Sequence, residues 1–173
     1  MTFDILARLL RWMAEETLLI AWHSRTGASE ALAGAAAQAA GAAARLAHAD
    51  EVEPADLLGA RAYIFVCPEN LGSMSGLMKE MFDRCYYPVL GQLEGRAYAT
   101  IVAAGSDGEG AQRQIDRIAA GWRLRRVADS IIVNLNAQTP EQILSPKLLD
   151  EPELARAFEL GAAMSEGIVL GIY

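Results

Sequence analysis

Short apolar segments alternate with longer helix-forming segments along this chain, and that alternation restricts the folds open to it. The clearest apolar segments are residues 17–22, 62–67, 98–104 and 130–135, which read TLLIAW, AYIFVC, YATIVAA and SIIVNL. Continuous apolar runs of this length predict strands that are buried on both faces of a sheet. Helical segments between such strands predict right-handed crossovers, a parallel sheet and helices on both of its faces.

The segments between these strands have the composition of helices. Residues 29–46 are dominated by alanine, the best helix former, and apolar residues within 74–85 recur at helical spacing. We therefore expect helices over residues 29–46, 74–85, 111–125 and 153–169. A weak second strand is expected near 45–49. The less regular, proline-containing stretch 136–152 is expected to form an edge element or a flap.

Residues 1–16 predict an amphipathic helix that precedes an α/β domain formed by residues 17–173. Its apolar positions recur near the helical period: Phe3, Ile5, Leu6, Leu9, Leu10 and Met13. Arg8 and Arg11 lie inside this apolar segment, a pattern that does not match a secretory signal. We expect the helix to pack on the domain or on a second subunit, and the latter arrangement would make the protein a homo-oligomer.

Composition limits the class of protein and its partners. The chain has 173 residues, 53% of them apolar, which predicts one compact domain and excludes intrinsic disorder. Its formal net charge of -7 argues against a nucleic-acid partner. Because no apolar run reaches the ~20 residues that span a bilayer, no membrane contact is expected. Cys67 and Cys85 form no Cys/His cluster, so we expect reduced thiols, no metal site and a cytoplasmic protein.

Three loops are expected to meet at one site. In a doubly wound sheet the ligand binds beyond the carboxyl ends of the strands, where the strand order reverses. With the order 2-1-3-4-5, that place is formed by loops 23–28, 68–73 and 105–110. The first loop joins a buried strand to the alanine-rich helix, and its candidate ligand residues are Ser24, Arg25, Thr26, Gly27, Ala28 and Ser29.

This first loop has the composition of an anion site. The hydroxyl groups of Ser24, Thr26 and Ser29 and the unpaired N–H groups of the helix start can converge on one phosphate group. The loop lacks the glycine patterns of nucleoside-triphosphate and dinucleotide sites, so a phosphomonoester fits better. An ordinary turn that caps the helix is the alternative interpretation.

The sequence HSRTGAS at residues 23–29 resembles the FMN-phosphate loop of the flavodoxin superfamily. Residues 68–84 resemble the loop and helix after the third strand in flavodoxin-like proteins and NAD(P)H-dependent FMN reductases, where they border the flavin ring. Residues 104–111 are similar to the family's loop after strand four. The resemblance implies a three-layer α/β/α sandwich with a five-stranded parallel sheet of order 2-1-3-4-5, FMN as cofactor and NAD(P)H as electron donor.

The second and third loops supply the other candidate flavin-binding residues. They are Pro68, Glu69, Asn70, Leu71, Gly72 and Ser73, followed by Gly105, Ser106, Asp107, Gly108 and Gly110. We expect backbone amides and Asn70 to hold the ring, with Gly72 at the closest approach of the backbone. Glu69 is interpreted either as a ligand for a polar flavin edge or as a solvated side chain. Pro68 and Gly72 could equally form a strand-to-helix turn without a ligand.

Aromatic side chains sandwich the flavin in electron-carrier flavodoxins, and both of these loops lack them. An aromatic face would then have to come from Trp22, Tyr86, Tyr87 or a partner subunit. His23 is expected to be a hydrogen-bonded packing residue, and Cys67 an inert buried thiol.

Cationic residues concentrate in one stretch of the chain, at Arg113, Arg117, Arg123, Arg125 and Arg126. A charge run of this kind favours a solvated helix face. The alternative is a contact for an acidic redox partner or for the phosphates of NAD(P)H.

These features lead to one functional expectation and two alternatives. We expect an FMN-binding oxidoreductase that passes electrons from NAD(P)H to a small-molecule acceptor or a redox protein. No catalytic side chain is assigned, because the cofactor itself performs the redox chemistry. The alternatives are a non-enzymatic electron carrier, which the missing loop aromatics disfavour, and a flavodoxin-fold interaction module that binds no flavin.

Overall fold

The computed structural model describes residues 17–173, and the helix expected over residues 1–16 lies outside the described residues. Strands and helices alternate as the sequence predicts. In chain order the elements are β1 (Leu18–Trp22), α2 (Ala28–Ala40), the short 3-10 helix Gly41–Ala43, β2 (Ala44–His48), α3 (Pro54–Gly59), β3 (Ala62–Asn70), β4 (Ser73–Met74), α4 (Gly76–Val89), β5 (Ala97–Ala104), α5 (Glu109–Gly121), β6 (Arg125–Arg126), β7 (Ile131–Asn134), α6 (Pro140–Leu144) and α7 (Glu151–Val169).

The sheet has the predicted strand order. β2, β1, β3 and β5 lie side by side and run parallel, so that Leu18 of β1 pairs with Ala44 on one side and with Ala62 on the other. Both β6 and β7 pair in parallel with the outer edge of β5. In the order 2-1-3-4-5, β5 is therefore the fourth strand, while β6 and β7 share the fifth position.

Within residues 17–173 the sheet has seven strands rather than five, for two local reasons. Residues 127–130 separate β6 from β7, so two short strands fill the fifth position. In addition, β3 continues to Asn70 and turns back into β4, so that Asn70 pairs with Ser73 in an antiparallel hairpin. The loop expected over residues 68–73 is thus largely a hairpin.

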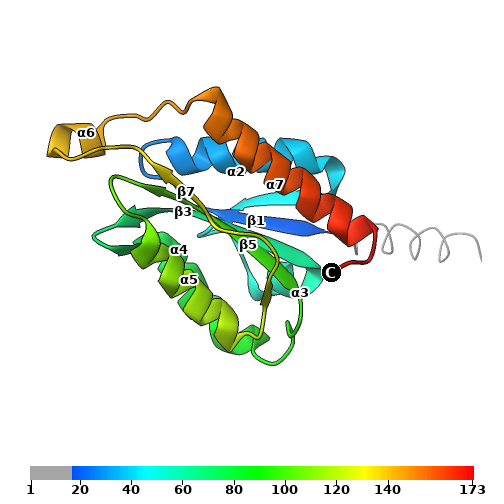
Figure 1. The fold of residues 1–173 in the computed structure, drawn as a ribbon. Coiled ribbons are helices and arrows are strands. Elements are labelled where there is room, and N and C mark those ends of the chain that lie inside the picture. The colour runs from blue at the N-terminus through cyan, green and yellow to red at the C-terminus, as the bar shows by residue number, and fades with distance from the viewer. Residues whose placement is uncertain (1–16) are drawn as a thin grey trace, which may run out of the picture.

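Helices cover both faces of the sheet, as Figure 1 shows. α2 and α7 pack on one face, and α4 and α5 pack on the other. The period-two alternation of β1 divides its side chains between the two cores: Leu18 and Ile20 face α2 and α7, whereas Leu19 and Ala21 face the opposite layer. This arrangement confirms the three-layer α/β/α sandwich.

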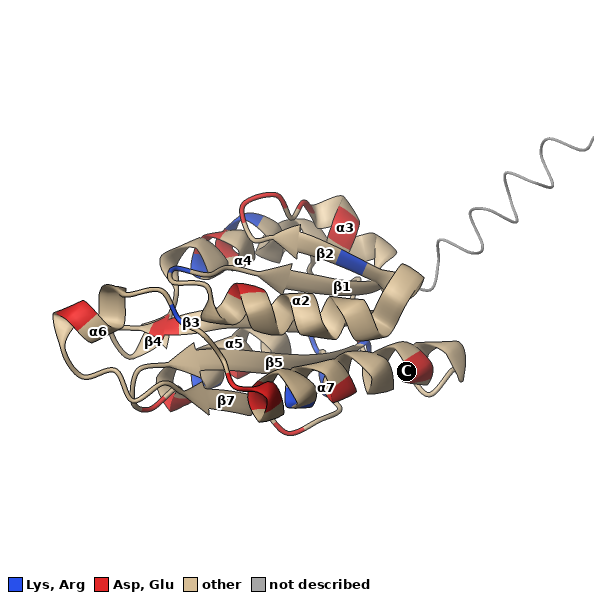
Figure 2. Ribbon diagram, turned by 90° about the horizontal axis from the view of Figure 1, so that it is seen from above, with Lys and Arg blue, Asp and Glu red and all other residues tan. Residues whose placement is uncertain are grey.

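Two segments differ from their expected form, one of them predicted as a longer helix and the other as an edge element or a flap. α2 ends at Ala40 rather than near residue 46, because residues from Ala44 onward pair with β1 instead. The stretch 136–152 contains the short helix α6, and Figures 1 and 2 place α6 beyond the same end of the sheet as the β3–β4 hairpin. Figure 2 also shows acidic residues in α6 and along α7.

Among residues 17–173, no helix combines the length and the apolar character that crossing a membrane requires.

Candidate functional site

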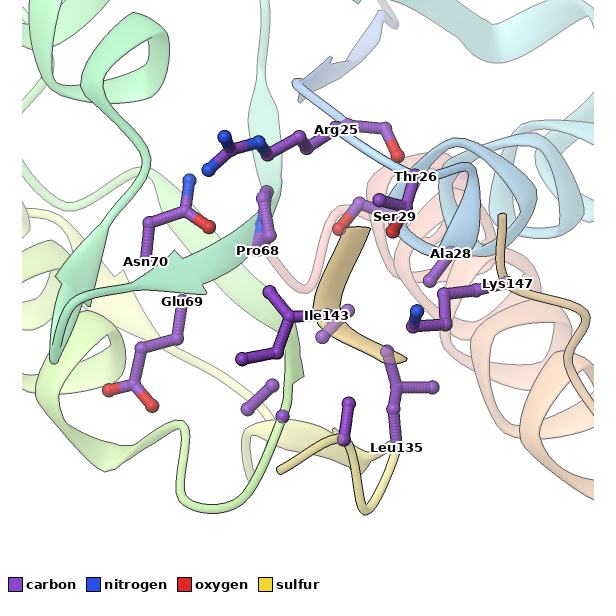
Figure 3. Close-up of a pocket in the computed structure, with 15 residues that line it drawn as sticks. Arg25, Thr26, Ala28, Ser29, Pro68, Glu69, Asn70, Leu135, Ile143 and Lys147 are labelled. Atoms are coloured by element: carbon purple, nitrogen blue, oxygen red, sulfur yellow. The ribbon is translucent and has the colours of Figure 1, made fainter. Parts of the chain in front are cut away.

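The three predicted loops converge at the carboxyl ends of β1, β3 and β5, where they border a pocket (Figure 3). The pocket contains about 440 Å³ of empty space, part of it open to solvent. The sequence-predicted residues that line it are Ser24, Arg25, Thr26, Ala28, Ser29, Pro68, Glu69, Asn70 and Gly105. The other lining residues are Ala103, Ala104, Leu135, Ala137, Ile143 and Lys147.

The first loop contains a buried hydroxyl group without a hydrogen-bond partner. Ser29, the second residue of α2, is 1% exposed, and its Oγ has no partner. An unpaired buried hydroxyl is costly, and the first N–H groups of a helix also lack partners within the helix. These donors together mark the start of α2 as a site for an anion.

The other residues of this loop have different surroundings. Ser24 Oγ accepts a hydrogen bond from the Gly27 N–H at 3.0 Å, so this hydroxyl holds the shape of the loop itself. Gly27 does not line the pocket, whereas Thr26 and Arg25 do. The interpretation as a helix-capping turn and the interpretation as an anion site therefore both describe part of the loop.

The tip of the second loop packs against α5 and not against the pocket. Leu71 and Gly72 have φ values of 53° and 73°, which is typical of a two-residue hairpin turn with left-handed backbone at both positions. A Cβ atom on Gly110 would lie 2.1 Å from the Gly72 carbonyl oxygen, so a glycine is needed where α5 meets this turn. Leu71, Gly72 and Ser73 do not line the pocket, although Gly72 was expected at the closest approach to the flavin.

Glu69 joins the second loop to the third. Its carboxylate accepts hydrogen bonds from the N–H groups of Gly108 and Ala111, the latter at 3.2 Å, at the start of α5. A carboxylate at this place satisfies unpaired N–H groups and interacts favourably with the helix dipole. Neither interpretation made from the sequence, a flavin ligand or a solvated side chain, included this contact.

Most of the third loop belongs to the scaffold. Gly105 lines the pocket, whereas Ser106, Asp107, Gly108 and Gly110 lie outside its lining. The Gly105 carbonyl accepts a hydrogen bond from the Ala137 N–H at 2.9 Å, and the Ser106 carbonyl accepts one from Asn134 Nδ2 at 2.6 Å. The loop is therefore held by Asn134 at the end of β7 and by the segment that follows this strand.

Residues 135–149 include most of the stretch that was expected to form an edge element or a flap, and they cover one side of the pocket. We use the name flap for residues 135–149. Leu135, Ala137, Ile143 and Lys147 of the flap are lining residues that the sequence analysis did not identify. The Lys147 N–H donates to the Thr26 carbonyl at 2.8 Å, which attaches the flap to the first loop. The prolines of this stretch indicate a flap, but no local signal indicates that it returns to residue 26.

Two cationic side chains border the pocket, and neither takes part in an ion pair among the described residues. Lys147 Nζ donates to neutral oxygens only, namely the carbonyls of Gln142 and Ser145 and the Ser145 hydroxyl. The other cation is Arg25. Positive charge that no carboxylate neutralises adds to the anion preference of the helix start.

His23 and Cys67 have structural roles beside the pocket. His23 Nδ1 and the Oγ of the buried Ser75 form a hydrogen bond at 2.8 Å. Burial, followed by repulsion from His48, lowers the pKa of His23, which favours the neutral imidazole. Burial also raises the pKa of the Cys67 thiol to about 12, so that this thiol stays protonated and unreactive near neutral pH.

The described pocket lining contains no aromatic side chain. Trp22 packs edge-on against His48, and Tyr86 stacks on Trp122. Tyr87 is 79% exposed on α4 and also lies outside the lining. The apolar surface of the pocket comes instead from aliphatic and small residues.

The arginine-rich stretch mostly forms contacts within the chain. The ion pairs are Arg113–Glu109 at 3.1 Å, Arg123–Glu94 at 3.4 Å and Arg126–Asp116 at 3.3 Å. Arg125 donates to the Ile172 carbonyl at 3.2 Å. These contacts favour the interpretation as a solvated face.

Comparison with solved structures shows a flavodoxin-like fold. A flavodoxin from the domain Archaea superposes with a TM-score of 0.68 and 15% identity, over 88% of this chain and 99% of that chain. The flavodoxin, WrbA-like protein from Agrobacterium tumefaciens gives a TM-score of 0.65 and 19% identity, over 89% and 98% of the two chains. The rubredoxin oxygen:oxidoreductase from Desulfovibrio gigas gives a TM-score of 0.71 and 11% identity. This match covers 99% of this chain but only 41% of that one.

The family model described as NADPH-dependent FMN reductase matches residues 45–138, which is more than half of the chain. The chain belongs to this family and thus to the flavin-binding oxidoreductases of the flavodoxin-like superfamily. The match includes the second and third loops and begins after the first. Among curated protein sequences, no match was found.

The residues of the pocket fit FMN. The unpartnered Ser29 hydroxyl, the start of α2 and the two cations suit a phosphate group. Ala103, Gly105 and Ile143 supply small and aliphatic surface, which suits a flat apolar ring. The pocket thus offers polar groups for a phosphate and apolar surface for a ring, as FMN requires.

Proposed function

We propose that this chain is an FMN-dependent oxidoreductase that takes electrons from NAD(P)H and passes them to a small-molecule acceptor or a redox protein. The observation that carries the proposal is the buried, unpartnered Ser29 hydroxyl at the start of α2, beside the point where the strand order reverses. Membership of the FMN reductase family supports FMN as the ligand of this site.

The two ends of the cofactor are assigned to different elements. The phosphate group belongs at Ser29, Thr26 and the first N–H groups of α2, where the helix dipole favours negative charge. The ring belongs beside Asn70 and Gly105, with Ile143 of the flap against it. Asn70 can donate and accept hydrogen bonds, as the polar edge of a flavin requires.

FMN supplies the redox chemistry when it is bound, since a flavin accepts a hydride from a nicotinamide and passes electrons onward. The protein binds and orients the cofactor. No acid or base is needed among the side chains, and the two nearby candidates have other roles: His23 is bonded to Ser75, and Cys67 stays protonated.

The aliphatic lining of the described pocket favours a reductase over an electron carrier. Aromatic side chains on both faces of a flavin would occupy the space that a nicotinamide needs. Here, alanines, glycine and Ile143 take their place, and part of the pocket is open to solvent. An open ring face is what hydride transfer from a second ligand requires.

The test begins with the absorption spectrum of the purified protein, before and after addition of FMN. We expect flavin bands, followed by oxidation of NADPH or NADH in the presence of a quinone or dye acceptor. Protein that binds no FMN would contradict the proposal and support the alternative of an interaction module without flavin. FMN binding without NAD(P)H oxidation would support the alternative of a non-enzymatic electron carrier.

A further inference from the structure

Lys147 brings a positive charge to the start of α2 from a distant part of the chain. Its backbone N–H donates to the Thr26 carbonyl at 2.8 Å, and its carbonyl oxygen lies 3.7 Å from the position of a Cβ atom on Gly27. Its half-buried side chain lines the same pocket as Ser29, and Figure 3 shows it extending into the pocket on the side of α2.

The ammonium group of Lys147 has only neutral partners. Nζ donates to the Gln142 carbonyl, to the Ser145 carbonyl at 2.7 Å and to the Ser145 hydroxyl at 3.1 Å, all within the flap. Lys79, the other lysine of the chain, forms an ion pair with Asp83. A cation beside a helix N-terminus is unfavourable unless an anion lies between them, because the helix dipole is positive at that end.

The Ser29 hydroxyl is the second, independent observation. It is buried, lines the pocket and has no partner. Neither its proton nor its oxygen atom therefore takes part in a hydrogen bond. One phosphate group would accept from this hydroxyl, from the first N–H groups of α2 and from the Lys147 ammonium.

We propose that Lys147 is a specificity-determining residue that selects a phosphomonoester ligand, FMN, over the uncharged riboflavin. The inference rests on the proposed function. When the phosphate group binds, the ammonium exchanges one neutral flap oxygen for a phosphate oxygen, so that the flap contributes charge as well as apolar surface. The remaining contacts to Gln142 and Ser145 keep the flap attached to the occupied loop.

The test compares FMN and riboflavin binding by the full-length apoprotein and its Lys147→Gln variant. Glutamine is shorter than lysine and carries no charge, so the variant loses the charge-assisted hydrogen bond that the ammonium would donate to the phosphate group. We expect FMN affinity to fall roughly tenfold to hundredfold, the usual effect of losing a hydrogen bond to a charged group, while riboflavin affinity stays unchanged. Lys147→Arg should restore most of the FMN affinity, and Lys79→Gln is the matched control that should change neither affinity.

Two outcomes with these variants would overturn the inference. Equal losses of FMN and riboflavin affinity would mean that Lys147 acts only by holding the flap. Unchanged affinity for both ligands would mean that its ammonium does not reach the phosphate group. Thermal melting of each apoprotein variant identifies any loss that results from unfolding. In that case, amine-reactive labelling of Lys147 in the wild-type protein, with and without phosphate, decides.

A second measurement separates this inference from the proposed function. If the wild-type apoprotein binds neither flavin, the proposed function fails, and inorganic phosphate becomes the probe. Amine-reactive labelling followed by mass spectrometry measures the labelling rate of the Lys147 amine, with Lys79 as internal control. Slower labelling of Lys147 alone in the presence of phosphate would support the phosphate role, and equal labelling with and without phosphate would overturn it.

Discussion

At the scale of single residues, two hydroxyl groups within residues 17–173 are buried without a hydrogen-bond partner, those of Ser29 and Ser130. Ser29 lines the pocket, whereas Ser130 directly precedes β7 and lies outside the lining. An unpaired buried hydroxyl costs free energy in the unliganded protein. A ligand that forms a hydrogen bond with such a hydroxyl removes this free-energy cost, and the gain adds to the binding affinity of the ligand.

We predict that Ser29→Ala weakens FMN binding without destabilising the apoprotein. The variant removes a hydrogen bond to a charged phosphate, worth roughly 1.5–3 kcal/mol, but in the apoprotein it only removes an unsatisfied group. Fluorescence titration and thermal melting measure the two effects. Ser130→Ala is the matched control and should change stability in the same way with no effect on binding. Undiminished FMN affinity in Ser29→Ala would move the phosphate group to another place.

Both cysteines are predicted to be unreactive in the folded protein. Burial raises the pKa of Cys67 to about 12 and that of Cys85 to about 11, so neither forms appreciable thiolate at about pH 8. Alkylation should be slow for native protein and fast in denaturant, which peptide mass spectrometry resolves for each thiol. Rapid labelling of native Cys67 would instead indicate a reactive thiol beside the pocket.

At the scale of elements, the second and third loops are held together by one side chain. Glu69 follows the buried part of β3, and its carboxylate binds the start of α5. The β3–β4 hairpin packs on the same helix turn, since a Cβ atom on Gly110 would collide with the Gly72 carbonyl. The pocket wall formed by Asn70 and Gly105 therefore depends on this contact.

Glu69→Ala is predicted to lower the free energy of unfolding and to weaken FMN binding. It leaves the N–H groups of Gly108 and Ala111 without their acceptor, which costs roughly 1–3 kcal/mol. Glu109→Ala is the control, because Glu109 also lies in the first turn of α5 but forms an exposed ion pair with Arg113. Urea denaturation measures the difference. Equal effects of the two variants would show that the Glu69 contact adds nothing beyond a surface charge.

Most elements are predictable from the sequence because their signals are local. The apolar runs of β1, β3 and β5 and the alanines of α2 act within one element, and the crossover rule then predicts a parallel sheet with helices on both faces. The strand order follows from the resemblance to the flavodoxin superfamily. The β3–β4 hairpin escapes prediction, because its turn is Leu71–Gly72 and the usual two-residue signal is Asn-Gly or Asp-Gly. A leucine with positive φ is rarely anticipated from sequence.

The candidate site is predictable in its position but not in its full composition. The switch-point rule places the three loops together. Most of the first loop, residues 68–70 and Gly105 do line one pocket, whereas Gly27, residues 71–73 and residues 106–110 lie outside its lining. Ile143 and Lys147 could not be found in this way, because they reach the pocket through tertiary contacts such as that between Lys147 and Thr26. Irregular segments carry no periodic signal that would report such a contact.

At the scale of the whole molecule, the end of the sheet opposite the pocket exposes apolar side chains. Val169, Leu170 and Ile172 are 62%, 63% and 59% exposed. The Arg61 N–H donates to the Thr17 carbonyl at 2.9 Å, and Arg61 borders a groove together with Tyr173. Thr17, the first described residue, therefore lies beside this apolar surface.

We predict that deleting residues 2–14 destabilises the protein or reduces its oligomeric mass. Each apolar side chain of that segment that is fully buried contributes roughly 1.5–3 kcal/mol, and a loss of 1 kcal/mol lowers the melting temperature of a chain this long by about 2–4 °C. Thermal melting and sedimentation velocity distinguish two arrangements. A lower melting temperature at unchanged mass means that the segment covers its own domain, and a lower mass means that it covers a second subunit.

The full-length variant with Leu6→Gln and Leu10→Gln should reproduce the effect of the deletion, because it removes apolar surface from the same stripe. If both proteins keep the melting temperature and mass of the wild type, the stripe packs on nothing and the prediction is wrong.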